Sequence, residues 1–516
     1  YDWVHRTGAN PPNEPVPGDF CENKSARPFL YEGTFAHEYQ HLLEHYEDAN
    51  EVNWVNEGLS DWAQTLTGYV DPSVPITDIG TDSHVQCFLG YLGVETPANP
   101  VPREGGPENS LTAWGDQGDD EILCDYGAAY TLMEFLRDSY GRPLMTRLHR
   151  LNANGFRGLT RAIALSGGTD TARETLHKWI AAVALDGVLD DGATMHGGDP
   201  AWYQVSTLDA TINWDTPRTH SDPGAPPNGA DFVRLRGANG DFLTAADLRT
   251  LEFDGAEALD PLPVEWVLDV NPPDHTADPA LYSGEPAPNI NRAIVEEVAV
   301  PTADPTLTFA NRYSMEEGYD YAYVEVSTDG GATWTRQSNN HTVVEGGFNG
   351  ESGCPLGSQG GDACSAQWVN ESFDLGAYAG QTVHVAFRAV YDGGVEFPGW
   401  WIDDVAVGGT AVSDGTDILE WQTPTQVNPV EVEGFTVQLV SYDDAHQNVY
   451  LGQVPLGEGF TASLDEATLQ SLLGTDGNVV GAIIMYDEST EEVVQYAPYE
   501  LTVNNIVQPG GAATTP

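Results

Sequence analysis

The sequence predicts a multidomain protein in which a mainly α-helical domain is followed by an all-β jelly roll and a second small β-sandwich. Two observations lead to this fold class. The chain has 516 residues, too many for one hydrophobic core and enough for about three domains. Helical periodicity prevails up to about residue 190, and short alternating runs between turns prevail beyond it. We expect domains at residues 1–205, 228–411 and 415–508.

The helical domain is expected to contain a metal site, because His37-Glu38-Tyr39-Gln40-His41 is an H-E-x-x-H motif. On a helix, His37 and His41 lie one turn apart on one face, so that both imidazoles reach the same ion. Glu38 projects beside that ion and can take a proton from water. A catalytic zinc site needs three protein ligands and one open position.

Glu57 is the natural third ligand, on a second predicted helix reached through the polar turn at 47–50. Asp61 lies one turn further on the same face, where it can accept the free ring N–H of a ligating histidine. His45 continues the i, i+4 series, but a fourth protein ligand would close the open position, so we predict a surface or packing role for it.

Together these motifs resemble the gluzincins, the thermolysin-like superfamily of zinc metallopeptidases. The resemblance implies a zincin fold over about the first 200 residues, with His37, His41 and Glu57 as Zn²⁺ ligands and Glu38 as general base. It also implies that Asp61 orients a ligand. The superfamily has a β-sheet before the metal helix, whereas about 35 residues precede His37 here. We therefore expect an upstream segment of the precursor, cleaved or separate; a minimal domain with a degenerate sheet is the alternative.

A later helix is expected to begin near Tyr126, with the apolar stripe Leu132, Phe135 and Leu136 facing the core. Tyr126 resembles the tyrosine of the one-zinc aminopeptidase branch of gluzincins, which implies that its hydroxyl donates to the oxyanion. An ordinary packing role is equally open, and Tyr130 is the fallback. Further helices are expected from 143 to 187. His149 and His177 are expected on their surface.

Cysteine spacing predicts disulfides, and hence an environment outside the cytoplasm. Cys354 and Cys364 flank a loop rich in glycine and serine, and Cys87–Cys124 is the pairing we expect among the other three. Cys21 is left over and could attach the upstream segment. The region 70–120 is rich in proline and reads as a long loop. His84 within it is a candidate cleft residue, although a solvent-exposed loop histidine is the simpler interpretation.

The charge of the chain is strongly negative, with 20 Lys and Arg against 79 Asp and Glu, a formal net charge of −59. This argues against nucleic acid as a partner, because phosphate binding needs a basic patch. The longest apolar runs are too short for a transmembrane helix. Salt tolerance and calcium binding are both open explanations for the acidity.

The β region contains DYAYVEVSTDGGATW at 320–334 and GWWIDDVAV at 399–407. These stretches resemble the jelly-roll domain that follows the catalytic domain in immune-inhibitor-A-type secreted peptidases, over roughly 230–410. Asp254, Asp403 and Asp404 could hold a structural Ca²⁺, with a solvated acidic turn as the alternative.

The function expected is that of a secreted zinc metalloendopeptidase acting on protein or peptide substrates. The alternative is an extracellular glycan- or protein-binding protein whose metal site is structural or vestigial.

Overall fold

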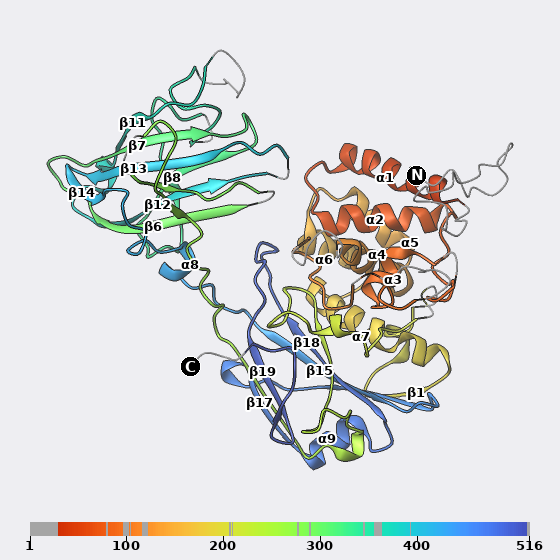
Figure 1. Ribbon diagram of the computed structural model, residues 1–516. Helices are drawn as coiled ribbons and strands as arrows, with labels where there is room; N and C mark the ends of the chain where they lie inside the picture. The colour runs from red at the N-terminus through yellow and green to blue at the C-terminus, as the bar shows by residue number, and fades with distance from the viewer. Residues whose placement is uncertain are drawn as a thin grey trace. The chain divides into compact units, whose positions relative to one another are not determined.

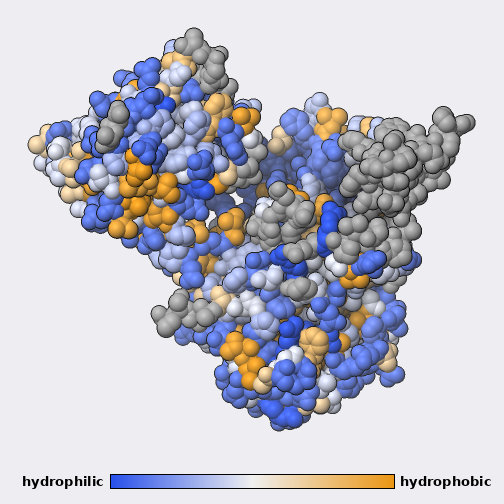
Figure 2. All heavy atoms as spheres, viewed as in Figure 1, coloured by the Kyte–Doolittle hydropathy of each residue, from blue (hydrophilic) through white to orange (hydrophobic). Residues whose placement is uncertain are grey.

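The computed structural model describes residues 29–512, apart from 79–80, 96–102, 104, 116–121, 206–207, 209, 276–277, 288–289, 344–345, 356–363 and 393. The chain divides into two compact units (Figure 1). Unit 1 consists of residues 1–259 and 431–516, and unit 2 of residues 260–430. Within the described residues, no helix is both long and apolar enough to cross a membrane. Hydrophilic residues cover most of the face in view in Figure 2, in keeping with the acidic composition.

The described part of unit 1 starts with helices that pack around a buried apolar core, as the periodicity predicts. Leu132 and Phe135 from one helix meet Trp179 and Ile180 from another in this core. The last helix of the set starts with a capping box, in which Thr171 and Glu174 satisfy the first backbone amides. The helices are α1 (Leu30–Glu47), α2 (Asn53–Leu66), α3 (Ser83–Phe88), α4 (Ile122–Tyr140), α5 (Arg142–Arg150), α6 (Gly155–Leu165) and α7 (Ala172–Asp190).

A five-stranded sheet completes the core of unit 1, in the order β1-β16-β15-β18-β2. Its strands are β1 (Thr194–His196), β2 (Asp231–Arg234), β15 (Phe435–Tyr442), β16 (Asn448–Gln453) and β18 (Val479–Tyr486). All residues of β15 and β18 are buried, which agrees with the continuous apolar sequence of β18. Helix α7 and helix α9 (Glu466–Leu473) both contact β15 and β16 (Figure 1).

A second sheet of unit 1 has the order β17-β3-β19-β20, from β3 (Thr250–Gly255), β17 (Thr461–Asp465), β19 (Tyr499–Val503) and β20 (Ile506–Val507). In both sheets, strands that precede unit 2 in the chain pair with strands that follow it. Val233 pairs with Ala482, and Phe253 lies between Ala462 and Leu501.

The division into units therefore differs from the three consecutive domains that the sequence predicts. Residues 431–512 do not stand as a separate sandwich, because their strands share sheets with β1, β2 and β3 of the first half. Unit 2 is an insertion between the two halves of unit 1. Local alternation identifies strands, but it does not say which distant strand each one pairs with.

Unit 2 is built from two antiparallel sheets around an aromatic core that includes Phe309, Phe348, Phe387 and Trp400. One sheet has the order β10-β8-β12-β6, with β9 on β8, and the other β11-β7-β13-β5-β4, with β14 on β13. The strands are β4 (Val267–Asp269), β5 (Ala280–Tyr282), β6 (Asn291–Ala299), β7 (Thr306–Ser314), β8 (Tyr321–Ser327), β9 (Thr335–Arg336), β10 (Gly347–Phe348), β11 (Val369–Asp374), β12 (Thr382–Val390), β13 (Gly399–Val407) and β14 (Thr410–Ser413). Two sheets sharing one core form the sandwich predicted for this region.

Candidate metal centre

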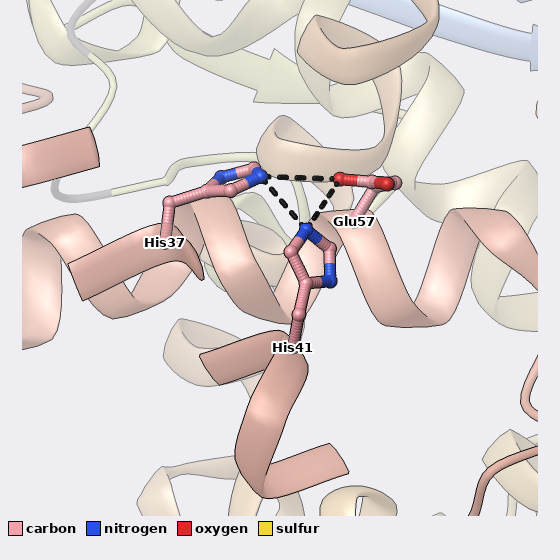
Figure 3. A group of neighbouring side chains, drawn as sticks. All are labelled: His37, His41 and Glu57. Carbon is pink, nitrogen blue, oxygen red and sulfur yellow. Dashed lines mark hydrogen bonds and ion pairs between the residues drawn. The ribbon is translucent and has the colours of Figure 1, made fainter. Parts of the chain in front are cut away.

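Three electron-pair donors meet where α1 packs against α2 (Figure 3). The Nε2 atoms of His37 and His41 are 3.0 Å apart, as expected for two histidines one turn apart on α1. Glu57 on α2 brings its Oε2 atom to 3.2 Å from each of these nitrogens. The chain reverses between Glu47 and Asn53, which lays the second helix beside the first.

The donor set fits a metal ion such as Zn²⁺. Ligands bound to tetrahedral zinc at about 2.0–2.1 Å lie about 3.3 Å from one another, close to the separations found here. The Oε2 atom of Glu57 is buried and faces the two imidazole nitrogens, so that one carboxylate oxygen and two ring nitrogens point to a common position. A buried carboxylate is costly unless positive charge, from protonated imidazoles or from a metal ion, compensates it.

The pKa shifts of the three groups show how strongly they interact. Burial lowers the pKa of His37, but hydrogen bonds to Asp61 and Glu57 outweigh it and raise the value to about 10. Glu57 likewise raises the pKa of His41 through a hydrogen bond. Burial raises the pKa of Glu57, and its contacts with the two histidines outweigh this effect and lower it. Without a metal, protons supply the positive charge that this site requires.

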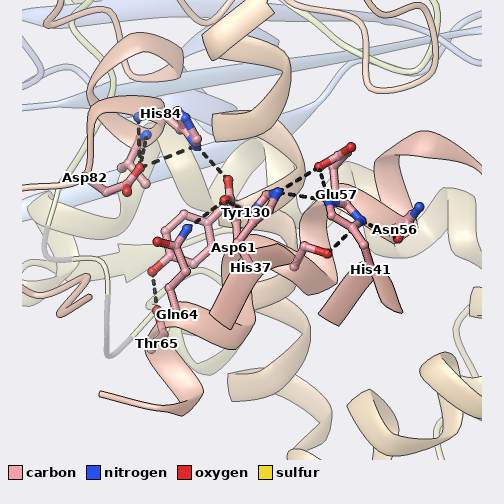
Figure 4. A network of polar contacts seen from close by, with 12 residues as sticks. His37, His41, Asn56, Glu57, Asp61, Gln64, Thr65, Asp82, His84 and Tyr130 are labelled. Carbon is pink, nitrogen blue, oxygen red and sulfur yellow. Dashed lines mark hydrogen bonds and ion pairs between the residues drawn. The ribbon is translucent and has the colours of Figure 1, made fainter. Parts of the chain in front are cut away.

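Both imidazoles are held by their other ring nitrogen (Figure 4). Asp61 is 1% exposed, and its Oδ1 atom lies 2.8 Å from His37 Nδ1. His41 Nδ1 lies 3.0 Å from Asn56 Oδ1 and 3.2 Å from Ser60 Oγ. Asp61 and Asn56 accept hydrogen bonds from the Nδ1–H groups of the two histidines. The lone pair of each Nε2 atom is therefore available to bind a metal ion.

His84 is a site residue for which the sequence favoured an exposed loop position. The structure places it on α3, with Nδ1 2.7 Å from Asp61 Oδ2. Burial lowers the pKa of His84, but Asp61 and Asp82 raise it to about 9. Burial raises the pKa of Asp61, and the two histidines, His84 first, bring it to about 2. One carboxylate thus bridges His37 and His84.

The position of His84 depends on close packing between α3 and α4. The disulfide Cys87–Cys124 links the two helices, as predicted. A Cβ atom at Gly127 of α4 would lie 2.1 Å from the carbonyl oxygen of His84, so only glycine permits this approach. The predicted disulfide close to His84 was the feature of the sequence that could have indicated a position for His84 near the site.

Tyr126 lies near the start of α4, with its ring centroid 5.0 Å from that of His84 and 6.3 Å from that of His37. Burial raises its pKa to about 12, and the carboxylates of Glu57, Asp61 and Glu38 add to the effect. The hydroxyl therefore keeps its proton at neutral pH. Tyr130, the fallback, is buried and its hydroxyl contacts Thr65, so it points away from the donors.

Glu38 is exposed on α1 and is close enough to Tyr126 to affect its pKa. His45 is also exposed and lies outside the group of donors. The expected surface histidines His149 and His177 are instead partly buried and bonded to acids, Glu44 and Asp487 respectively.

The carboxylates expected to hold calcium belong to different units. Asp254 lies on β3 in unit 1, whereas Asp403 and Asp404 lie on β13 in unit 2. Asp403 is buried and bonds to His275 at 2.9 Å. Among the described residues, two further groups have ligand atoms within 4.8 Å of one another: His275, Asp278 and Asp403, and Glu316, Asp320 and Asp392. The second predicted disulfide, Cys354–Cys364, is present, and Cys21 lies outside the described residues.

Comparison with known proteins agrees with the resemblance of the β region. Residues 274–439 match the family described as "Immune inhibitor A-like, MAM domain". The chain is 30% identical over 101 residues to Bacillopeptidase F of Bacillus subtilis (strain 168), covering 20% of this chain and 6% of that protein. It is 25% identical over 233 residues to the Pre-pro-metalloprotease PrtV of Vibrio cholerae serotype O1 (strain M66-2), covering 38% of this chain and 24% of that protein.

The chain thus spans 24% or less of the length of these relatives. The similarities are those of a protease-related protein. The metalloprotease among the relatives is in keeping with a metal cofactor.

Proposed function

We propose that this chain is a zinc-dependent metalloendopeptidase of the gluzincin type that acts outside the cell. The observation that carries the proposal is the meeting of His37, His41 and Glu57, with the far nitrogen of each imidazole held in place. When bound there, zinc polarises the scissile carbonyl and lowers the pKa of the attacking water. Three protein donors leave a position open for that chemistry.

Glu38 serves as the general base of the proposed reaction. It follows His37 on the helix, and its carboxylate is exposed to an approaching substrate. It accepts a proton from the attacking water and delivers it to the leaving amine. Tyr126, which remains protonated, donates a hydrogen bond to the oxyanion that develops on the substrate. Asp61 keeps His37 in the tautomer that the site requires.

The test is to measure bound zinc together with casein hydrolysis, with and without a chelator. Glu38→Gln should lower kcat by about 10²–10⁴-fold, because it removes the general base, while zinc content is unchanged. Glu47→Gln is the matched control, since Glu47 is also exposed on α1 but lies beyond the site. Full activity in Glu38→Gln would overturn the mechanism.

A second candidate function is binding of a glycan or protein outside the cell, with a structural metal. It is favoured by the family match, which falls on the β region and not on the metal site. Zinc bound with no hydrolysis, and a fourth protein ligand in the coordination shell, would support this function over the peptidase.

An upstream segment of the precursor remains the proposed partner of unit 1. The outer face of α1 carries Phe35, Tyr39, Leu42 and Tyr46, whose exposed fractions are 62%, 51%, 49% and 79%. A contiguous apolar face of this kind marks an interaction surface. Adding the upstream polypeptide should reduce the binding of an apolar fluorescent dye to this face, and unchanged dye binding would argue against it.

A further inference from the structure

The charged residues of this chain are unevenly distributed, and one stretch of unit 1 is basic. Residues 139–169 contain no Asp or Glu, although 79 of the 516 residues of the chain are acidic. The same stretch holds five of the 20 Lys and Arg residues, namely Arg142, Arg147, Arg150, Arg157 and Arg161. We call these five residues the arginine surface.

The arginine surface is formed by two neighbouring helices, α5 and α6 (Figure 1). The apolar side chains of both helices are buried in the core, and the arginines lie outside it. Arg147 is partly exposed and donates a hydrogen bond to Ser166 Oγ at 3.0 Å, which ties α5 to the end of α6. The others are exposed and form no ion pair with a described residue: Arg142, Arg150, Arg157 and Arg161.

Acidic residues that border the two helices already have partners of their own. Glu44 is held by an imidazole of α5. Glu51 and Glu491 accept hydrogen bonds from the first two backbone amides of α6, where the helix dipole favours negative charge. Asp138 and Asp170 each pair with a basic residue outside the arginine surface. The positive charge of the surface is therefore available to a partner.

The shape of α5 adds a place where such a partner can bind. A hollow of about 470 Å³ is lined by Pro143, Thr146, Arg147, Arg150 and Leu151. Guanidinium groups bind carboxylates through two parallel N–H···O bonds, and the hydroxyl of a threonine can donate a further one. The apolar lining suits the CH₂ groups of a glutamate side chain.

We infer that the arginine surface binds acidic segments of the polypeptides on which this protein acts. Carboxylates spaced along an extended peptide match arginines that are spread over two helices. A polyanion of uniformly high charge density, such as nucleic acid or a sulfated polysaccharide, would reach beyond the surface and meet a chain of net charge −59. At about 0.15 M salt the repulsion fades within about 8 Å, so a short acidic peptide interacts mainly with the arginines.

The arginine surface lies beside the helix that carries the proposed zinc ligands. Gln40 is next to His41 on α1, and its Nε2 atom lies 3.4 Å from Nδ1 of His149 on α5. A polypeptide that crosses α5 therefore passes close to α1, and it extends by about 3.3 Å per residue. That the bound polypeptide is a substrate rests on the proposed peptidase function, whereas its acidic character rests on the arginines alone.

The test measures binding of two labelled peptides of equal length to the zinc-free chain by fluorescence anisotropy, in about 0.15 M salt. One peptide carries glutamate at regular intervals, and the other carries glutamine at the same positions. The glutamate peptide should bind about tenfold more tightly, because several exposed arginine–carboxylate pairs each add a small factor. This preference should shrink when the salt concentration is raised.

The double variant Arg150→Gln, Arg157→Gln should lose most of the preference, with little change for the glutamine peptide. The matched control is Arg249→Gln, Arg336→Gln, which changes the net charge equally at exposed positions elsewhere and should keep the preference. Equal losses in the two double variants would assign the effect to net charge and overturn the inference. Arg161→Gln should give a smaller loss, and it tests the same surface if the first double variant does not fold.

Equal affinity of the wild type for the two peptides would overturn the inference. Tighter binding of a short heparin oligosaccharide than of the glutamate peptide would overturn the choice of a polypeptide as partner. With zinc bound, the wild type should hydrolyse the glutamate peptide with a KM about tenfold lower than that for the glutamine peptide. A preference in binding without any hydrolysis would count against the proposed peptidase and support the arginine surface.

Discussion

In the part of the chain that the structure describes, two groups of histidine and carboxylate side chains, one in each unit, have ligand atoms within 4.8 Å of one another. In unit 1, Glu57 Oε2 lies 3.2 Å from the Nε2 atoms of both His37 and His41, and Asp61 and Asn56 bond the opposite ring nitrogens of these histidines. In unit 2, Asp403 bonds directly to His275, and Asp278 is 59% exposed.

The ring of His275 packs against Trp368, with the two centroids 4.4 Å apart. Proximity alone therefore does not distinguish a metal site from an ion pair. The hydrogen bonds from Asp61 and Asn56 to the far ring nitrogens are what favour the group in unit 1 as the candidate metal site.

The comparison is tested most strongly by removing one carboxylate from each group. Glu57→Ala should weaken zinc binding by about 10²–10³-fold, because it removes one of three protein ligands, and each ligand of a four-coordinate zinc site contributes about a quarter of roughly 10–16 kcal/mol. Asp278→Ala should leave zinc content and hydrolysis unchanged, because its group forms an ion pair. Zinc titration of both variants checks this. Equal losses in the two variants would mean that the groups are equivalent.

The next effect concerns Tyr126, whose ring centroid lies 6.3 Å from that of His37. Tyr126→Phe should lower kcat by about 10²-fold, the usual loss for one oxyanion donor, with zinc affinity unaltered. Single-turnover kinetics with metal analysis measures both. A change in KM alone would assign Tyr126 to substrate binding or packing.

A third test concerns Asp61, which fixes the imidazole of His37 through a hydrogen bond to Nδ1. Asp61→Asn keeps the size of the side chain but weakens the acceptor for His37 Nδ1, and should reduce zinc affinity by about 10–100-fold. Competition with a fluorescent zinc chelator is the measurement. Unchanged affinity would show that the tautomer of His37 is fixed by something other than Asp61.

The smallest effect is the pH dependence of the His84–Asp61 ion pair in the metal-free protein. The pKa of His84 in the folded protein is about 9, above its ordinary value of 6.5. The ion pair therefore makes its full contribution to the free energy of unfolding below pH 6.5, and this contribution is lost as the pH rises through 9. Asp61, at about 2 against 3.8, keeps its contribution above pH 3.8 and loses it as pH falls through 2.

His84→Gln should therefore lower the free energy of unfolding, by an amount on the order of 2 kcal/mol, between pH 4 and 6.5. The difference from wild type should shrink above pH 9. Denaturant titration at several pH values measures it, and a difference that is independent of pH would exclude the ion pair as its cause.

The sequence alone determined what depends on neighbours along the chain. The i, i+4 spacing of His37 and His41 fixes their shared face once the helix forms, and a short turn suffices to bring Glu57 alongside. The alternation of the β strands and the pairing of Cys354 with Cys364 are similarly local.

Only the tertiary structure decided what depends on distant segments. It joined β2 to β18 and β3 to β19 across the inserted unit 2, and it placed His84 on Asp61. It also buried Glu44 and Asp48, which read locally as an ordinary acidic helix end. Burial and long-range pairing are properties of the packed core. The sequence shows the same aspartate or glutamate whether its carboxylate contacts water, a histidine or a cation.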